Sequence, residues 1–463
     1  MRGPQEIVER ALTTSSTDGC VAIVSETSGA NLRWANNTLT TNGVQEDRRL
    51  TVIATVGGAT GTAAGVVTGT GNLEELVEDV VARAESAARA APPAEDAQPL
   101  VGAASGDGTS DWSEPPQQTS IRVFASFAEE LGEALRRADA ENRVLYGYAS
   151  HDLASTFVGT TAGARCRYDQ PTGYVELNAK SRDGSRSAWA GAGTSAFGDD
   201  LSLASMEQDL ITRLEWAGRS IELPAARYET ILPPGAVADL MINLYWAAGG
   251  RDAHDGRSPF SRAGGGTRVG ERLTDVALTL HSDPYAPGVT CTPFVVAESS
   301  GDTVSVFDNG LGLSPTAWID AGVLRALTQT RHSAALTGLA VTPYVDNLIL
   351  EGPGRGELAD LIAATERGLL LTCLWYIREV DPRSLLLTGL TRDGVYLVER
   401  GEVVGAVNNF RFNDSPLDLL ARVLDTSATA RTLPREWSDY FTRTEMPALR
   451  VADFNMSSVS QAN

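Results

Sequence analysis

The sequence predicts an α+β fold, in which strands and helices form separate runs along the chain. Short segments of alternating apolar residues, bounded by Gly, Asn and Asp, are typical of strands and occur within residues 21–56 and 144–181. Amphipathic patterns between those two clusters predict helices over residues 73–91 and 121–140. Because strands follow strands and helices follow helices, the pattern favours segregated layers over alternating β-α units.

The length of 463 residues predicts two domains. We expect an N-terminal domain with α/β layers over residues 1–222, followed by a β-rich C-terminal domain with packed helices over residues 223–463. Residues 92–119 are rich in Pro, Gly, Ser and Asp and contain few large apolar side chains. This composition predicts a long exposed loop within the first domain.

The second half contains strand patterns separated by strong turn signals. A hairpin is expected between residues 292–297 and 303–308, followed by a turn at Asp308-Asn309-Gly310. Residues 318–328 have a mixed pattern that allows a helix, and residues 356–367 predict one. Further strands are expected at residues 276–280, 348–351, 386–390, 395–398, 403–407 and 446–454.

The clearest single element is an apolar helix over residues 236–248. It follows Pro233 and Pro234, which suit a first helical turn, and Gly249 and Gly250 end it. Apolar residues occupy nearly its whole circumference, which is typical of a helix buried in a core or at an interface. The helix contains no His, Cys or Glu, so the side chains that most often bind zinc are missing from it.

Composition excludes several classes of function. The chain has 59 acidic and 38 basic residues, and its formal charge of -21 argues against nucleic acid and anionic membrane surfaces as partners. Four scattered cysteines without a CxxC pair suit a reducing cytoplasm. The N-terminal residues lack the apolar region of a signal peptide, and no apolar run is long enough to cross a bilayer. We therefore expect a cytoplasmic protein.

Isolated residues give only open alternatives for chemistry. His254 lies beside Asp252 and Asp255, and these three residues either bind a metal or form a solvated turn. Cys373 is either a nucleophile or a buried core residue. Six other polar residues could contact a partner or a peptide, or could equally form turns, ion pairs and a hairpin end. They are Arg378, Asp381, Arg392, Asn408, Asn409 and Arg411.

Several ordered segments resemble the TldD/TldE (PmbA) peptidase family. Similarity to its second domain is carried by GGRDAHDGRSPF, LTDVALTLHSDP, GVTCTPF and VFDNGLG. Similarity to its late helix-plus-sheet region is carried by GELADLIAATERGLLLTCLWYIREVDP and TGLTRDGVYLVERGEVVGAVNNFRFNDSP. The resemblance covers most of the chain and rests on the order of these turns and strands, without one diagnostic motif.

The resemblance implies a subunit of a heterodimeric zinc metallopeptidase that cleaves unfolded or modified peptides. In that family the TldD-like subunit carries HExxxH on the helix equivalent to residues 236–248, with a cysteine near its C-terminus. The motif positions correspond to Ile242, Asn243 and Ala247, and no cysteine follows Cys373. The chain thus resembles the TldE subunit, which has no metal of its own.

Expectations for partners follow from the resemblance. A TldD-like catalytic subunit holds the zinc, a peptide is the substrate, and Tyr245 and Trp246 pack or contact the partner. Two alternatives stay open. One is a stand-alone peptide-binding or homodimeric protein without peptidase activity. The other is a peptidase that uses a different set of metal ligands.

Overall fold

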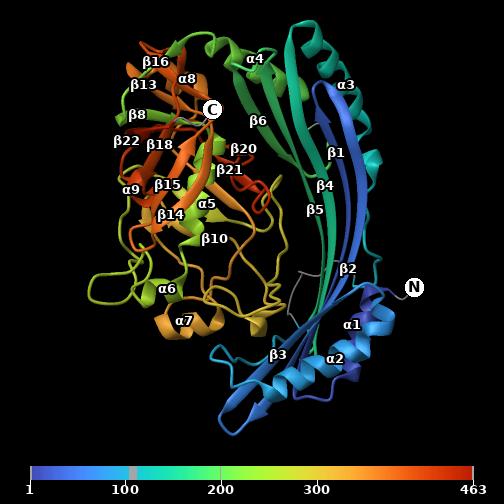
Figure 1. The fold of residues 1–463 in the computed structure, drawn as a ribbon. Helices are drawn as coiled ribbons and strands as arrows, with labels where there is room; N and C mark the ends of the chain where they lie inside the picture. Colours follow the sequence, from blue (N-terminus) through green and yellow to red (C-terminus); the bar gives the residue numbers. More distant parts are fainter. Residues whose placement is uncertain (1–2, 104–111, 199, 461–463) are drawn as a thin grey trace.

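The computed structural model describes residues 3–103, 112–198 and 200–460. The N-terminal part is built on one antiparallel sheet of six strands in the order β3-β2-β1-β4-β5-β6. Its strands are β1 (Gly19–Ala35), β2 (Thr38–Gly58), β3 (Gly61–Thr70), β4 (Arg143–Thr160), β5 (Arg165–Ser181) and β6 (Ser187–Thr194). Strands β1, β2, β4 and β5 are long and strongly curved, and together they span most of the height of the molecule (Figure 1).

Helices cover only one face of this sheet. The helices are α1 (Pro4–Thr14), α2 (Leu73–Ala90), α3 (Ala125–Ala140) and α4 (Leu203–Trp216). Alternation along the strands explains this layering, because successive side chains point to opposite faces. In β1, Ala22 and Val24 pack with α1 and α2, and Leu32 and Trp34 pack with α3 and α4. Val21 and its neighbours on the opposite face pack against the C-terminal half instead.

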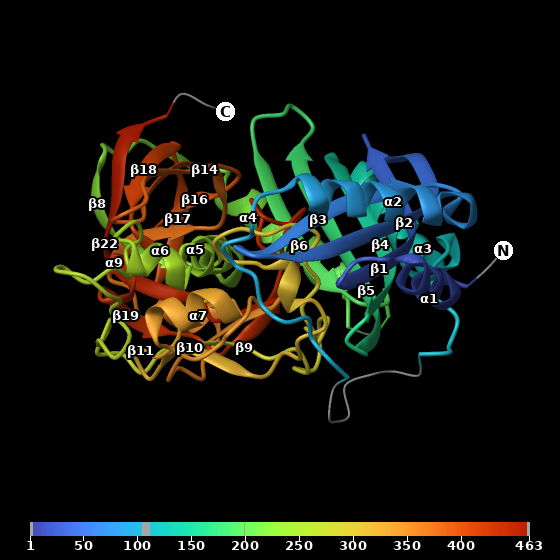
Figure 2. The same ribbon diagram turned by 90° about the horizontal axis from the view of Figure 1, so that it is seen from below.

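The C-terminal half consists of two sheets with helix α5 (Pro234–Trp246) between them (Figures 1 and 2). One sheet has ten strands: β7 (Ser220–Ile221), β8 (Ala226–Leu232), β13 (Arg367–Leu371), β14 (Leu374–Asp381), β15 (Leu386–Thr391), β16 (Val395–Glu399), β17 (Glu402–Val407), β18 (Phe410–Asp414), β19 (Val423–Thr426) and β22 (Leu449–Val459). The other has six: β9 (Thr279–Ser282), β10 (Thr316–Asp320), β11 (Val323–Leu324), β12 (Leu348–Glu351), β20 (Ala430–Thr432) and β21 (Thr444–Met446).

Short helices complete this half: α6 (Gly250–His254), α7 (Arg331–Thr337), α8 (Leu358–Ala363) and α9 (Pro416–Leu420), with a 3-10 turn at Val306–Asp308. A second 3-10 turn, Ile121–Phe124, precedes α3 in the N-terminal half. The predicted α+β class is confirmed, since strands and helices form separate layers around the N-terminal sheet and around α5. No helix of the described residues is long and apolar enough to cross a membrane.

The sequence also predicts turns at residues 28–30 and 169–172, and both predictions are wrong. Residues 28–30 lie within β1, and residues 169–172 lie within β5. Gly29 serves close packing there, because a Cβ on it would lie 2.3 Å from Oδ1 of Asp152. Asn36 and Asn37 predict a further turn. This turn is confirmed, and both residues adopt the positive φ that asparagine tolerates.

Two predictions for the C-terminal half are also wrong, and a third is confirmed only in part. Residues 292–297 do not pair with 303–308; the backbone instead joins Val295 to Leu311 and Gly310, and the Asn309 side chain bonds both backbone groups of Ala297. The Asn309 side-chain amide thus forms the two hydrogen bonds that a neighbouring strand would have made with Ala297. Residues 318–328 form the β10–β11 hairpin and no helix, and α8 covers only the middle of the predicted 356–367 helix because β13 begins at Arg367.

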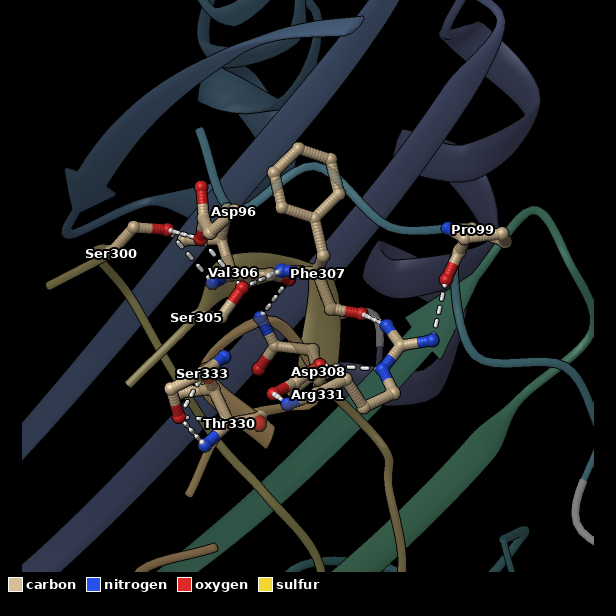
Figure 3. Close-up of polar contacts among 11 residues, drawn as sticks. Asp96, Pro99, Ser300, Ser305, Val306, Phe307, Asp308, Thr330, Arg331 and Ser333 are labelled. Carbon is tan, nitrogen blue, oxygen red and sulfur yellow. Dashed lines mark hydrogen bonds and ion pairs between the residues drawn. The ribbon is translucent and has the colours of Figure 1, made fainter. Parts of the chain in front are cut away.

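The predicted exposed loop is partly a packed strap. Of residues 92–119, positions 104–111 lie outside the described residues. Residues 92–103, which we call the strap, run from α2 to the C-terminal half, and Ala94, Ala97 and Leu100 pack against Phe294 and Phe307. The Asp96 carboxylate accepts hydrogen bonds of 2.6 Å from the hydroxyls of Ser300 and Ser305 (Figure 3).

Candidate functional site

Helix α5 lies at the centre of the C-terminal core, as its apolar pattern predicts. It runs from Pro234 to Trp246, two residues earlier at each end than expected, and nine of its residues are buried. Tyr245 is inside this core, where its hydroxyl donates to the Val345 carbonyl at 3.1 Å and accepts from the Val345 N–H at 2.8 Å. Tyr245 therefore packs inside the chain and presents no surface to a partner.

The three positions that correspond to the zinc motif do not fit a metal. Ile242 is fully buried among apolar side chains, and Ala247, the C-cap residue of the helix, offers only a methyl group. The Asn243 amide donates to the Asp239 carbonyl at 2.8 Å within the same helix. Zinc needs imidazole, thiolate or carboxylate ligands. Across the described residues, moreover, no group of three or more His, Cys, Asp and Glu side chains is placed to hold a metal ion.

The only charged residue of α5, Asp239, instead anchors a distant segment. We call residues 433–439 the α5 loop. The buried Asp239 carboxylate accepts hydrogen bonds from the N–H groups of Glu436 at 3.0 Å and Arg435 at 3.3 Å. The Asp239 carbonyl accepts one from the Trp437 indole at 3.2 Å. This carboxylate therefore satisfies backbone donors that would otherwise be buried without partners.

Because the Asp239 carboxyl is buried, its contribution to folding stability should depend on pH. Burial raises the pKa of Asp239 well above its ordinary range, although the N–H groups of Glu436 and Arg435 lower it. The unfolded chain has the ordinary aspartate pKa of about 3.9. Above that value the folded state binds more protons than the unfolded state, so this group's contribution to stability falls as pH rises through the folded-state pKa.

Asp239→Asn should therefore flatten the pH dependence of stability. Its amide oxygen can still accept one N–H bond, but it carries no charge at any pH. We expect the urea concentration at the midpoint of unfolding to fall less in the variant than in the wild type as the pH is raised from 5. If the urea midpoint changed with pH in the same way in both proteins, the pH dependence would not come from Asp239. Asp183→Asn is the matched control, because the pKa of this exposed carboxyl is lowered to about 2 by its hydrogen bonds with Ser181 and Ser185.

Arg435 in the α5 loop is held between two tryptophans from different sheets. Its guanidinium carbon lies 5.0 Å from the Trp189 ring of β6 and 4.9 Å from the Trp375 ring of β14. It also pairs with Asp393 at 3.2 Å and lies 4.0 Å from the Cys373 sulfur. Stacking of a cation on aromatic faces is favourable, more so when water is excluded. The cluster joins the N-terminal sheet to the late strands beside α5.

The environment of Cys373 favours the core interpretation over a nucleophile. Its thiol is buried, and burial raises its pKa although Arg435 lowers it. A reactive thiolate requires a lowered pKa and access to solvent. The other cysteines, Cys20, Cys166 and Cys291, are also buried as free thiols. His254, at the end of α6, is exposed, and no metal cluster surrounds it among the described residues.

Three of the predicted contact residues surround the α5 loop. Trp246, with 39% of its surface exposed, packs edge-to-face on Trp437 with ring centroids 4.9 Å apart. Arg378 pairs with Glu436 at 3.3 Å, and the Arg392 guanidinium lies 6.0 Å from the Trp375 ring. The structure therefore brings Trp246, Arg378 and Arg392 to one border, between the end of α5 and strands β14 and β15.

The other predicted contact residues bond within the late sheet. The Asp381 carboxylate closes a turn by accepting from the Ser384 hydroxyl at 2.6 Å. The Asn408 amide oxygen accepts from the Leu223 N–H at 2.7 Å, and that of Asn409 accepts from Thr391 at 3.1 Å. Arg411 donates to the Thr388 hydroxyl at 3.3 Å. These bonds hold turns and strand ends.

Sequence reasoning missed the α5 loop and Trp189 entirely. Arg435, Glu436 and Trp437 follow Pro434 in a segment without periodicity, and Trp189 lies far away in β6. One signal was available: Asp239 is the single carboxylate in an otherwise apolar helix. A charge in such a position requires buried donors.

Comparison with known protein families covers nearly the whole chain. Residues 225–458 match the PmbA/TldA metallopeptidase C-terminal domain, residues 20–90 match domain 1, and residues 113–217 match the central domain of the same family. The chain belongs to the PmbA/TldD metallopeptidase family. No curated protein matches it. Our division into two domains at residue 222 stays a prediction.

Solved structures share the fold of this family member at low identity. TldE from Thermococcus kodakarensis is 16% identical with a TM-score of 0.77, over 97% of this chain and 99% of that one. A putative modulator of a DNA gyrase from Thermotoga maritima is 16% identical with a TM-score of 0.75, over 97% and 99%. A putative modulator of DNA gyrase from Bacteroides thetaiotaomicron is 14% identical with a TM-score of 0.76, over 98% and 99%.

Proposed function

We propose that this chain is the non-catalytic, TldE-like subunit of a heterodimeric zinc metallopeptidase. The observation that carries the proposal is the position of the motif residues. Ile242, Asn243 and Ala247 lie on a helix packed into the core, and the carboxylate of that helix binds backbone N–H groups. The zinc and the catalytic base then belong to a TldD-like partner, and this chain supplies no cofactor.

The border around the α5 loop is the surface that we assign to the partner and its peptide substrate. Trp246 and Tyr376 are exposed large aromatic residues, and the exposed guanidinium of Arg378 lies over the Tyr376 ring. Aromatic and arginine side chains are the ones most enriched at the centres of protein interfaces. A cytoplasmic location agrees with the four buried free cysteines, and unfolded or modified peptides are the proposed substrate class.

The test is the metal content and peptidase activity of the purified chain, alone and after co-expression with a TldD-like subunit that has HExxxH. We expect zinc and activity only in the co-expressed preparation, with both chains eluting together. The matched control is a partner whose motif glutamate is replaced by glutamine, which should still elute with this chain but be inactive. Stoichiometric zinc in the lone chain, or separate elution of the two chains, would refute the proposal.

A second candidate is a homodimeric or peptide-binding protein without peptidase activity. The observation that favours it is an open strand edge on the N-terminal sheet, because residues 38–47 of β2 pair with β1 whereas β3 pairs with β2 only from Arg49 to Gly58. This candidate requires a stable complex with peptide in the absence of any partner subunit. Calorimetric titration of an unfolded polypeptide into the lone chain distinguishes this second candidate from the first.

A further inference from the structure

A cavity of about 270 Å³ lies between the N-terminal sheet and the C-terminal half. Thr156 of β4 lines it on one side, and residues 292–313, Thr330 and residues 343–346 contribute the other lining side chains. Ser305 and Asp308 bound it on the side of the strap (Figure 3). Of the described residues that line the cavity, none belongs to the α5 loop. It is therefore separate from the border that we assign to the partner.

Most of the cavity wall is apolar. The apolar lining residues are Phe294, Val295, Val296, Val304, Leu313 and Pro343. Phe294 is 4% exposed and Val296 is 38% exposed, so the apolar wall extends from the core to the surface. Sites for small molecules are mainly apolar, contain a few polar groups and usually have volumes of roughly 300–1,000 Å³. The cavity is slightly smaller, which suits a single side chain.

Asp346 brings a carboxylate to this wall. Its Oδ2 accepts a hydrogen bond from a guanidinium N–H of Arg443 at 2.5 Å, whereas its Oδ1 accepts none within the described residues. The side chain is 45% exposed. Burial nevertheless raises the pKa of Asp346, although Arg443 lowers it. A carboxylate that is accessible and at the same time surrounded by protein opens into a cavity rather than into bulk water.

The charges and hydroxyls of the wall favour a cation. The second carboxylate of the wall, Asp308, is 2% exposed and is paired with Arg331 at 2.6 Å. No basic residue is among the described residues that line the cavity. Three threonine hydroxyls on the wall form no hydrogen bond within the described parts of the chain; they belong to Thr156, Thr292 and Thr303. The wall thus offers several acceptors and no competing cation.

We propose that this cavity binds an aliphatic primary ammonium with the chemistry of a lysine side chain. An ammonium is a compact charge with three donors, so it can donate to Oδ1 of Asp346 while Arg443 keeps Oδ2. A guanidinium forms its strong bidentate pair with both oxygens of a carboxylate, and one of them is already taken. The four-carbon stem of lysine packs on the apolar wall, as the stems of long charged side chains do.

A chain N-terminus fits the same wall less well. Its first peptide group lies close to the ammonium and would enter the apolar part of the cavity, where a polar group without a partner is costly. The inference also goes beyond the proposed function. The cavity consists of residues of this chain alone, so the lone chain binds the ammonium with or without a TldD-like subunit. In such a complex the lysine would belong to the peptide substrate.

The experiment is a saturation-transfer NMR titration of the lone full chain with pentylammonium, at constant ionic strength and slightly acidic pH. Pentanol is the matched neutral ligand, and leucinamide represents a chain N-terminus. We expect saturable binding of pentylammonium. Pentanol should bind about tenfold more weakly or worse, because it loses a hydrogen bond between charged groups. Leucinamide should also bind more weakly than pentylammonium.

Two variants test the site. Asp346→Asn keeps the shape of the side chain but removes its charge, and should weaken pentylammonium binding by about tenfold or more. This variant also weakens the pair with Arg443. Val296→Trp therefore leaves Asp346 intact and fills the outer part of the cavity, and it should weaken binding as well. Asp320→Asn removes a 51% exposed carboxylate outside the cavity wall and is the matched control, which should bind like the wild type.

Four results would overturn this inference. Pentylammonium could show no saturable binding to the wild type, or could bind no better than pentanol, which would leave an apolar site only. Unchanged binding by folded Asp346→Asn and Val296→Trp would place the ligand elsewhere. Tighter binding of leucinamide than of pentylammonium would identify a chain N-terminus as the ligand and refute the lysine assignment. Thermal unfolding of each variant checks that it is folded.

Discussion

Arg331→Met is expected to destabilise the chain by about 3–5 kcal/mol, the range for breaking a buried ion pair from one side. Arg331 opens α7 and reaches Asp308, whose side chain is 2% exposed, with Nε 2.6 Å from Oδ1. Its other nitrogens donate to the carbonyls of Phe307 at 2.5 Å and Pro99 at 2.9 Å (Figure 3). The substitution leaves a buried carboxylate and loses a contact with the strap.

The matched control for this prediction is Arg325→Met. Arg325 pairs with Asp320 at 3.3 Å, and the two side chains are 53% and 51% exposed. Such surface pairs contribute about 0–1 kcal/mol. Urea unfolding followed by tryptophan fluorescence measures both variants. Equal losses would show that the Arg331 pair contributes no more than a surface pair.

A double-mutant cycle separates the ion pair from the strap contact. Asp308→Asn removes the buried charge, so adding Arg331→Met to it should cost clearly less than Arg331→Met alone. Additive losses would assign the effect to the carbonyls of Phe307 and Pro99 instead. Because the chain has two large parts, the comparison uses the midpoint of the first transition rather than one global free energy.

Restoring the zinc motif should destabilise the fold without creating a zinc site. In the triple variant Ile242→His, Asn243→Glu, Ala247→His, the imidazole at position 242 enters a fully buried apolar site. Loss of apolar contacts and burial of an unpaired polar group together cost about 2–5 kcal/mol. The cluster beside α5 supplies no ready third ligand, since its one thiol, Cys373 beside Arg435, is buried and burial raises its pKa, which disfavours the thiolate that zinc requires.

Metal analysis and thermal unfolding test this prediction together. We expect substoichiometric zinc in the triple variant and the same melting temperature with and without added zinc. A ligand that binds only the folded state raises its stability, so a zinc-dependent rise in melting temperature would contradict the expectation. The single variant Ala247→His is the control, because position 247 is only half-buried and should tolerate an imidazole.

Local patterns in the sequence predicted elements well where burial repeats with a regular period. Helix α5 was expected within two residues at each end, because an all-apolar helix between prolines and glycines has few alternatives. Strands β16 and β17 were expected at residues 395–398 and 403–407, within one residue of their observed ends, because apolar runs flank Arg400 and Gly401. Patterns failed where glycine served packing, as at Gly29 inside β1, because glycine signals a turn and a close approach equally.

The sequence alone determined that this member of the PmbA/TldD family has no HExxxH on its central helix, because missing ligands can be read from residue identities. The tertiary structure decided what replaced them. It brought Asp239 to the N–H groups of the α5 loop, and it placed Arg435 between Trp189 and Trp375. It also paired residues 38–47 of β2 with β1 alone, because β3 pairs with β2 only from Arg49 to Gly58. Periodicity reports only which side of an element is buried, whereas these features depend on which distant segments meet.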